Sequence, residues 1–198
     1  ILQLNVRSLQ SNRNYLETFL KINNIDIVLL SETWCKRSQI INISNYKFIR
    51  ADRNDGYGGS GILIKNNIYF KTIQFQPKFN NNKIQTCGIS FKISNSYITI
   101  ISIYCAPGHK FQSNFWSTLF SSLSSPALIC GDFNAYHRSF GCAFNNAEGR
   151  DLLDAVHDEN LCLLNDGTAT LLQRPDRRPS AVDLSICSPS LVPRLEWK

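Results

Sequence analysis

Alternating and periodic apolar positions predict that the chain begins with a strand, a helix and a second strand. Residues 1–6 alternate apolar and polar side chains as a strand does. A helix is predicted next, with Ser11 or Asn12 as its N-cap. Its apolar stripe consists of Tyr15, Leu16, Phe19 and Leu20. The largely apolar run 25–30 is typical of a buried strand.

The middle of the chain is rich in β-branched and aromatic residues, with Asn and Gly turns between the runs. Predicted strands cover residues 46–50, 60–65, 68–75, 84–93 and 96–105. Strands that follow one another through short turns usually pair as neighbours. We therefore expect an antiparallel meander in this part of the chain.

The last part of the chain returns to helices separated by short strands. A second amphipathic helix is predicted from its apolar positions, which are Phe111, Phe115, Trp116, Leu119, Phe120 and Leu123. A short central strand covers 127–131, and a third helix begins with Asn145 as N-cap and Glu148 three residues later. This third helix buries Leu152, Leu153 and Val156. Strands near 161–165 and 182–187 follow, so we expect an α/β fold of two mainly antiparallel sheets packed face to face, with helices outside.

Length, composition and net charge favour a globular protein that binds a polyanion. The chain has 198 residues, 43% of them hydrophobic, which suits one globular domain with a sizeable core. Its seven cysteines include no C-x-x-C pair, so we interpret them as reduced core residues of an intracellular protein and exclude a zinc site. No apolar run is long enough for a membrane span. The net charge of +6 favours a polyanionic partner such as nucleic acid.

Polar side chains interrupt or end the apolar strands at three places. Asn5 lies inside the first strand, Glu32 follows the run 25–30, and Asp132 and Asn134 follow the strand 127–131. A carboxylate at the end of a buried strand is costly unless it is hydrogen-bonded, paired or bound to a cation. Strand alternation would place Asp132 and Asn134 on one face. Oxygen ligands without a His or Cys cluster suit Mg²⁺ or Mn²⁺.

Six short segments between residues 2 and 184 carry a resemblance to a known family. They are LQLNVRSL (2–9), SETW (31–34), GGSG (58–61), YCAP (104–107), GDFNA (131–135) and SAVDL (180–184). In this order they resemble the motif series of the exonuclease-endonuclease-phosphatase superfamily. More closely, they resemble the apurinic-type endonuclease domain of non-LTR retrotransposon polyproteins. One such segment alone is weak evidence for the family, whereas the ordered series of six is specific for it.

The resemblance implies a four-layer α/β sandwich and a divalent-metal-dependent endonuclease. Such an enzyme nicks one strand of double-stranded target DNA and leaves a 3′-hydroxyl. The reverse transcriptase domain of the same polyprotein extends that hydroxyl in target-primed reverse transcription. We accordingly expect Mg²⁺ or Mn²⁺ as the cofactor and a nuclear location, without a membrane partner.

The resemblance also assigns roles to residues around the metal. Glu32 is the principal metal ligand, and Asn5 holds the metal or its hydrogen-bond shell. Asp132 orients or deprotonates the attacking water, and Asn134 positions the water and the scissile phosphate. These roles agree with phosphodiester hydrolysis, which requires an activated water and stabilisation of the charge that develops on phosphate.

Two further catalytic residues follow from the resemblance, and one expected residue is missing. Tyr104 contacts the phosphate, and Asp183 orients a catalytic histidine. That histidine belongs to a Ser-Asp-His motif beyond Asp183, and none of His109, His137 and His157 occupies it. We expect residues 1–198 to form a single endonuclease domain that lacks its last strand and this motif. Alone, it should be weakly active or inactive.

Several exposed groups are candidates for DNA contacts. The loop with Arg174, Arg177 and Arg178 is predicted to meet the DNA backbone or minor groove, and His137 to touch DNA or the site. The glycine-rich stretch 56–59 suits either a phosphate cradle or an ordinary hairpin turn.

Other functions of the same fold stay open at this stage. A host apurinic-site repair nuclease is the nearest enzymatic alternative, and a phosphatase or sphingomyelinase is less favoured. A truncated, inactive DNA-binding module is the non-enzymatic alternative. The presence of Glu32, Asp132 and Asn134 argues against decay, because a degenerate copy would not be expected to keep these costly residues.

Overall fold

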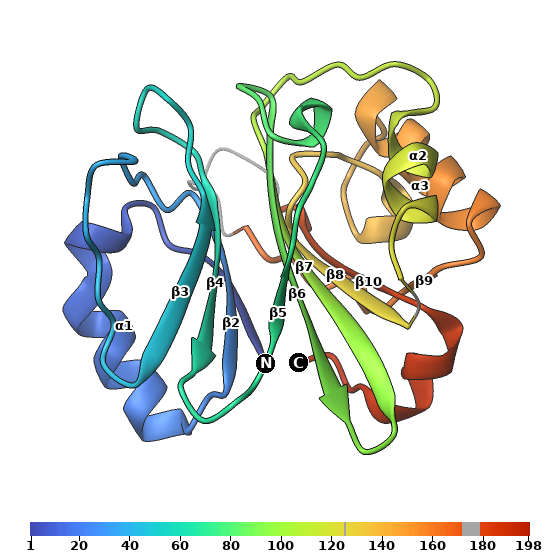
Figure 1. The fold of residues 1–198 in the computed structure, drawn as a ribbon. Coiled ribbons are helices and arrows are strands. Elements are labelled where there is room, and N and C mark those ends of the chain that lie inside the picture. The colour runs from blue at the N-terminus through green and yellow to red at the C-terminus, as the bar shows by residue number, and fades with distance from the viewer. Residues whose placement is uncertain (125, 172–178) are drawn as a thin grey trace.

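The computed structural model describes residues 1–124, 126–171 and 179–198, and it confirms the predicted α/β sandwich of two facing sheets (Figure 1). Helix α1 (Leu9–Asn23) covers the outer face of one sheet. Helices α2 (Phe115–Ser121) and α3 (Ala147–Asp158) cover the outer face of the other sheet. The molecule therefore has four layers, in the order helix, sheet, sheet, helices.

The smaller sheet has four strands in the order β1-β2-β4-β3. Its strands are β1 (Leu2–Asn5), β2 (Ile27–Ser31), β3 (Tyr46–Ala51) and β4 (Ser60–Lys65). The pair β1 and β2 is parallel, because α1 carries the chain back between them, and the other pairs are antiparallel.

The larger sheet has six strands in the order β5-β6-β7-β8-β10-β9. Its strands are β5 (Lys71–Ile73), β6 (Ile84–Ile93), β7 (Ser96–Cys105), β8 (Ala127–Asp132), β9 (Cys162–Leu163) and β10 (Asp183–Cys187). The predicted single meander is wrong, because β3 and β4 belong to the smaller sheet and β5 to β7 to the larger one. The predicted strand 68–75 shrinks to β5, because the residues after β4 carry the chain from one sheet to the other.

Two helix starts differ from the sequence prediction. The N-cap of α1 is Ser8, whose Oγ accepts from the Ser11 N–H, while the Asn12 side chain donates to the Val6 carbonyl at 2.9 Å. The N-cap of α3 is Asn146, whose Oδ1 accepts from the Gly149 N–H at 2.8 Å. The predicted cap residue, Asn145, instead accepts from the Arg138 N–H.

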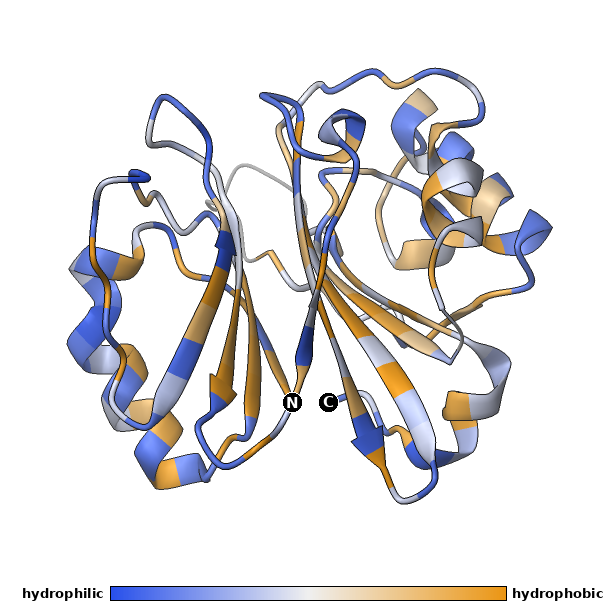
Figure 2. Cartoon of the chain, in the orientation of Figure 1, coloured by the Kyte–Doolittle hydropathy of each residue, from blue (hydrophilic) through white to orange (hydrophobic). Residues whose placement is uncertain are grey.

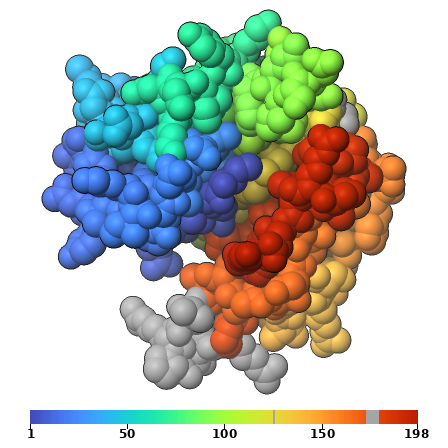
Figure 3. All heavy atoms as spheres, turned by 90° about the horizontal axis from the view of Figure 1, so that it is seen from below, coloured from blue at the N-terminus to red at the C-terminus, as the bar shows by residue number. Residues whose placement is uncertain are grey.

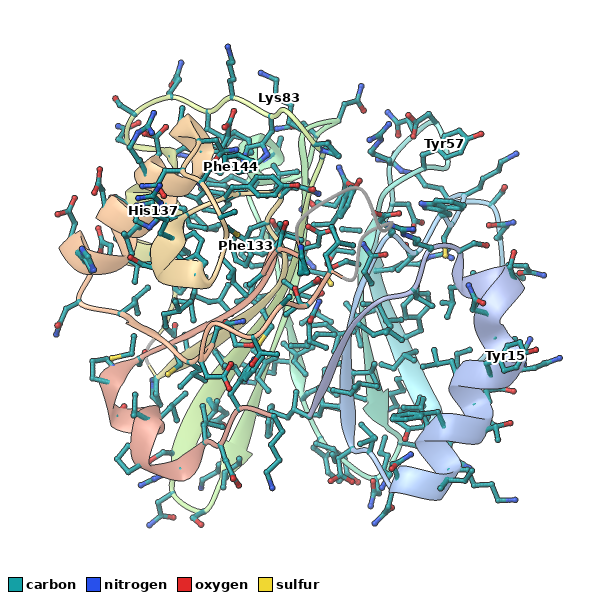
Figure 4. All side chains as sticks on the ribbon, turned by 180° about the vertical axis from the view of Figure 1, so that it is seen from behind. Tyr15, Tyr57, Lys83, Phe133, His137 and Phe144 are labelled. Atoms are coloured by element: carbon teal, nitrogen blue, oxygen red, sulfur yellow. The ribbon has the colours of Figure 1, made fainter. Side chains whose placement is uncertain are left out.

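The predicted apolar stripe of the first helix is only half right. Leu16 and Leu20 are buried together with Leu9, whereas Tyr15 is 81% exposed and Phe19 is also exposed. Tyr15 precedes Leu16 and therefore points about 100° away around the helix. Figure 4 shows Tyr15 projecting outward from α1.

Helix α2 is shorter than predicted, because it begins at Phe115 and ends at Ser121. Phe111 lies in the loop before it and stacks on Phe115, with ring centroids 3.9 Å apart. Aromatic packing thus continues the apolar surface without helical backbone. In Figure 2, hydrophobic residues concentrate along the strands and on the inner faces of the helices.

The space between the sheets is apolar except beneath one end of the strands, where buried serines cross-link the sheets. Ser31 Oγ on β2 donates to the Ile103 carbonyl on β7 at 3.2 Å. Ser60 Oγ on β4 donates to Ser102 Oγ on β7 at 2.9 Å, and Ser102 Oγ donates to the Leu30 carbonyl at 3.2 Å. These bonds fix how the two sheets are aligned at that end.

The cysteines agree with the prediction of reduced core residues. All seven are free thiols, and all except the half-buried Cys162 are buried. Within the described ranges, no helix is long and apolar enough to cross a membrane.

Candidate active site

The strand ends that carry the predicted site residues meet at one end of the sandwich. Strand β1 ends at Asn5, which is in register with Ser31 at the end of β2. In the other sheet, Asp132 at the end of β8 is in register with Tyr104 on one side and Asp183 on the other. Residues from five strands therefore surround the same position.

The Asn5 amide joins the two carboxylates that the sequence singled out. Its Nδ2 donates to Glu32 Oε1 at 2.9 Å and to Asp132 Oδ2 at 2.9 Å. Its Oδ1 is buried and has no hydrogen-bond partner among the described residues. One side chain of the smaller sheet thus bridges a carboxylate beside it and a carboxylate of the opposite sheet.

Further hydrogen bonds from backbone and buried side chains hold Asp132. Its N–H donates to Ser31 Oγ at 3.1 Å, and its Oδ1 accepts from the Asn134 N–H at 3.0 Å. The Asn134 side chain donates from Nδ2 to the Cys105 carbonyl at 2.9 Å. Strand alternation was expected to place Asn134 on the same face as Asp132. Asn134 instead has a φ of 45°, so it reaches the site from a left-handed turn.

Asp183 receives its own partner from the opposite sheet. Gln3 Nε2 donates to Asp183 Oδ1 at 2.7 Å. The Asp183 N–H donates to Thr170 Oγ1 at 3.1 Å. Gln3 was missed in the sequence, although it lies two residues before Asn5 and therefore on the same face of β1.

Burial and mutual repulsion disfavour the charged forms of these acids. Burial, followed by the negative charge of Asp183, raises the pKa of Asp132 from 3.8 to about 8. Burial also raises the pKa of Asp183. The pKa of Tyr104 is raised by burial and by the charges of Glu32 and Asp132, so its ring lies within their electrostatic reach. The site therefore concentrates negative charge, and no cationic side chain among the described residues lowers the Asp132 pKa.

A cavity of about 980 Å³ opens beside these side chains. Its polar lining includes Asn5, Arg7, Glu32, Asp132, Asn134 and Asp183. Further lining comes from residues 1–4, from β8 and β10, from Pro107 and from residues within 164–171 and 194–198. Figure 3 shows the N-terminal segment beside the C-terminal segments on one face. Solvent and a phosphate group can thus reach a site that is otherwise formed by buried strand ends.

The oxygen atoms at this site fit a divalent cation, although few side chains supply them. No cluster of three or more His, Cys, Asp or Glu side chains in the described part of the chain could hold a metal by itself. Glu32, Asp132 and the unpartnered Asn5 Oδ1 nevertheless offer hard oxygen ligands at one point. A cation there would satisfy the orphaned oxygen and offset the charge that raises the Asp132 pKa.

The backbone around the site adopts left-handed conformations at non-glycine residues. Glu32 has a φ of 52° and Trp34 a φ of 51°. Such a conformation is costly for a residue with a side chain, and it persists only where neighbouring contacts impose it. Two of these contacts are visible: the Trp34 N–H donates to the Gly58 carbonyl at 2.9 Å, and the Glu32 carbonyl accepts from the Ser8 N–H at 2.9 Å.

The glycine-rich loop 56–59 is a turn in which three of the four N–H groups have partners within the protein. The Gly56 N–H donates to the Arg53 carbonyl, and the Tyr57 N–H to Asp55 Oδ1. The Gly59 N–H donates to Gln85 Oε1 at 2.8 Å. These three groups favour the ordinary turn over a phosphate cradle, and Gln85, which the sequence did not reveal, holds the turn at Gly59.

Among the described contacts of Asp183, no partner is a histidine. The buried His109 bonds through Nδ1 to the Ala106 carbonyl, and His157 lies in the last turn of α3. His137 caps a short 3₁₀ helix, with its Nδ1 accepting from the Ser139 N–H. The three predicted DNA-contacting residues Arg174, Arg177 and Arg178 lie outside the described residues.

Solved structures of nucleases share this fold. The endonuclease domain of TRAS1, a telomere-specific non-LTR retrotransposon, superposes with a TM-score of 0.75 at 19% identity, covering 96% of this chain and 85% of that one. An AP endonuclease from Leishmania major superposes with a TM-score of 0.73 at 14% identity, covering 97% of this chain and 79% of that one.

Curated relatives by sequence are proteins of mobile elements. A probable RNA-directed DNA polymerase from transposon BS of Drosophila melanogaster is 23% identical, over 94% of this chain and 21% of that protein. The RNA-directed DNA polymerase from mobile element jockey of Drosophila funebris is 25% identical, over 91% of this chain and 20% of that protein. The chain thus spans about a fifth of the length of these relatives.

A family model also matches the second half of the chain. That model describes an endonuclease-reverse transcriptase, and the match covers residues 98–198. This range includes β8 and β10, which carry Asp132 and Asp183. Because the match extends over more than half of the sequence, the chain belongs to the endonuclease-reverse transcriptase family.

Proposed function

We propose that the chain is the endonuclease domain of a non-LTR retrotransposon and nicks one strand of double-stranded DNA with Mg²⁺ or Mn²⁺. The observation that carries this proposal is the Asn5 amide, which joins the Glu32 and Asp132 carboxylates at the wall of an open cavity. A buried and a half-buried carboxylate in contact with one amide are costly for a purely structural site.

Glu32, Asp132 and Asn5 Oδ1 would hold the divalent cation. When bound, that ion supplies charge stabilisation at the phosphate oxygens and a lowered pKa of a coordinated water. Glu32 is half-buried at the cavity wall, so it faces both the protein and the incoming phosphate.

In this proposal Asp132 orients or deprotonates the attacking water. Burial raises its pKa above the ordinary carboxyl value, and a bound cation would favour the ionised form that a general base needs. Asn134, whose N–H donates to Asp132 Oδ1, and Tyr104, which is in register with Asp132, would position the water and the scissile phosphate. Neither side chain adds negative charge where the phosphate enters.

Asp183 would orient a histidine that acts on the same phosphate. Gln3 holds one Asp183 oxygen at 2.7 Å and leaves the carboxylate at the cavity wall. His109 and His137 bond other groups and His157 lies in the last turn of α3, so we propose that another segment of the polyprotein supplies this residue. The same polyprotein would supply the reverse transcriptase that extends the nicked 3′-hydroxyl in the nucleus.

A basic depression beside the site supports DNA as the substrate. A cavity of about 570 Å³ is lined by Lys78, Lys83 and Lys110 together with uncharged residues, and its described lining has no acidic side chain. Lys83 directly precedes Ile84, which is in register with Cys105 next to the site. Figure 4 shows Lys83 at the same end of the sandwich as Tyr57. Lysines placed there would neutralise DNA phosphates near the nick.

The proposal is tested by nicking of supercoiled plasmid with Mg²⁺, with Mn²⁺ and with chelator. The chain should be assayed alone and joined to the adjoining part of its polyprotein. We expect metal-dependent nicking by the wild type and its loss in Asp132→Ala. The matched control is Asp26→Asn, an exposed acid that pairs with Lys65 at the opposite end of β2. Equal nicking by wild type and Asp132→Ala would reject the proposal.

A host apurinic-site repair nuclease is the second candidate, because an AP endonuclease shares the fold over nearly the whole chain. A duplex with one abasic site separates the two functions. A large preference for that duplex over intact DNA would favour repair, and nicking of intact plasmid would favour the retrotransposon endonuclease.

A further inference from the structure

We propose that Trp34 and Tyr57 form a stacking platform that holds one unstacked nucleobase beside the phosphodiester that is cut. This inference rests on the proposed function and adds to it a substrate feature, namely a base that has left the double helix. It is drawn from an exposed aromatic pair that the catalytic assignment does not use.

The two rings are exposed and in contact at the rim of the site. Trp34 is 38% exposed and Tyr57 is 62% exposed. Their ring centroids lie 5.9 Å apart at an interplanar angle of 70°. In an edge-to-face pair, one ring turns its edge to the other, so ring faces stay available for a third planar group.

The chain places this pair next to the catalytic carboxylate at a conformational cost. Trp34 follows Glu32 by two residues, so their Cα atoms lie within about 7 Å of each other. The φ of 51° at Trp34 is unfavourable for a bulky aromatic residue. Strain of this kind concentrates at binding and catalytic sites, where it fixes the direction of a side chain.

The opposite ring is fixed by the glycine turn. A Cβ at Gly58 would lie 2.7 Å from Tyr104 Cε1, and one at Gly59 would lie 2.4 Å from Thr33 Oγ1. The turn is therefore pressed between the site tyrosine and the residue that precedes Trp34. This packing holds the backbone of Tyr57 in a fixed position relative to Trp34.

Charge around the pair favours a nucleic acid as the occupant. Lys36 and Arg37 are exposed just beyond Trp34, and the Lys36 side chain packs along the turn at Gly56. Arg53 precedes the turn and pairs with Asp55. A base on the rings would thus have cationic groups near its phosphates, which combines stacking with electrostatic attraction. A base inside a duplex already has both faces covered, so only an unstacked base can use the platform.

The test compares binding of an intact fluorescein-labelled duplex with binding of the same duplex carrying a three-nucleotide bulge. Fluorescence anisotropy is measured in chelator, so that no cleavage interferes. We expect the wild type to bind the bulged duplex about 5- to 160-fold more tightly, the range for one base on an aromatic side chain. Trp34→Ala and Tyr57→Ala should each lose most of that preference.

Two kinds of control separate stacking from loss of structure. Trp34→Phe and Tyr57→Phe keep a ring and should keep the preference. Tyr15→Ala removes an even more exposed tyrosine on α1, on the outer face of the smaller sheet, and should change nothing. Thermal unfolding of each variant shows that the fold is intact. No bulge preference in the wild type, or an undiminished preference in a folded Trp34→Ala, Tyr57→Ala double variant, overturns the inference.

Plasmid nicking run in parallel keeps this inference distinguishable from the proposed function. Metal-dependent nicking without a bulge preference rejects the stacking platform alone. A bulge preference that depends on both rings, in a chain that never nicks DNA within its polyprotein, rejects the nuclease and leaves the platform as a nucleic-acid-binding site.

Discussion

Asn5 and Asp132 lie 127 positions apart in the sequence and in different sheets, yet a hydrogen bond of 2.9 Å joins Asn5 Nδ2 to Asp132 Oδ2. The same nitrogen bonds Glu32 Oε1 at 2.9 Å. One neutral amide therefore contacts both carboxylates, and its hydrogen bond lowers the pKa of Asp132 against the effect of burial.

Replacing that amide should lower catalysis without unfolding the protein. In Asn5→Ala both carboxylates lose a charge-assisted hydrogen bond worth about 1.5 to 3 kcal/mol, so we expect kcat/KM for nicking to fall about 10- to 100-fold. The pH optimum should rise, because the Asp132 pKa rises without its donor. Asn23→Ala on α1 is the matched control, since its Nδ2 bonds only a helix carbonyl. An unchanged rate and pH profile would contradict this role.

The raised pKa of Asp132 also predicts how stability depends on pH in chelator. The folded pKa of about 8 exceeds the ordinary value of 3.8, so the protonated acid stabilises the fold below about pH 4. That stability is lost as the pH rises towards 8. Thermal unfolding between pH 5 and 8 should show a falling melting temperature, and Asp132→Asn should flatten the curve.

Added Mg²⁺ provides the complementary measurement. A cation competes with the proton on Asp132, so Mg²⁺ should raise the melting temperature more at pH 8 than at pH 5. An equal effect at both values would argue against a metal site at this carboxylate.

The lysine-lined cavity predicts a defined contribution to DNA binding. Lys83→Ala should weaken binding to every duplex alike and reduce the salt slope by about 1, as expected for one lost phosphate contact. Lys21→Ala, an exposed lysine in the last turn of α1, should alter neither quantity. Titrations of labelled DNA at several salt concentrations measure both effects. A Lys83→Ala slope equal to that of wild type would remove this cavity from the DNA footprint.

Alanine substitutions at two glycines with positive φ separate the cost of backbone strain from the cost of a steric clash with a neighbouring side chain. Gly108→Ala has no atom within 4 Å of the new Cβ and a φ of 67°, so it should cost about 1 to 2 kcal/mol of unfolding free energy. In Gly59→Ala the Cβ would also meet Thr33 Oγ1 at 2.4 Å, which adds about 1 to 3 kcal/mol. Urea unfolding measures the two losses, and equal losses would show that the turn can move away from Thr33.

Strands with strong alternation were predictable from sequence alone. The predicted ranges 60–65, 84–93 and 96–105 coincide with β4, β6 and β7. The start of α1 was not predictable, because Ser8, Ser11 and Asn12 are equally good caps by chemistry. The choice of Ser8 depends on its N–H donating to the Glu32 carbonyl, a contact that exists only in the folded chain.

The sequence predicted most of the candidate site residues, but it did not predict which of them contact one another. Costly polar groups at strand ends identified Asn5, Glu32 and Asp132, whereas Gln3 was missed because a glutamine on a half-buried strand is unremarkable by itself. Its importance comes from Asp183, which β10 brings beside Asp132 by antiparallel pairing. Strand order is a long-range property that alternation within one segment cannot reveal.

The hydrogen bonds of the buried serines beneath the strand ends fix the alignment of the two sheets. Because Asn5 and Glu32 belong to one sheet and Asp132 to the other, sliding of the sheets by a single residue step would separate the carboxylates by about 3 Å. Ser31 and Ser102 oppose that slip with bonds to the facing sheet. A sandwich of this kind should thus lose its reaction geometry before it loses its secondary structure, so that slippage of the layers is its earliest route to inactivation.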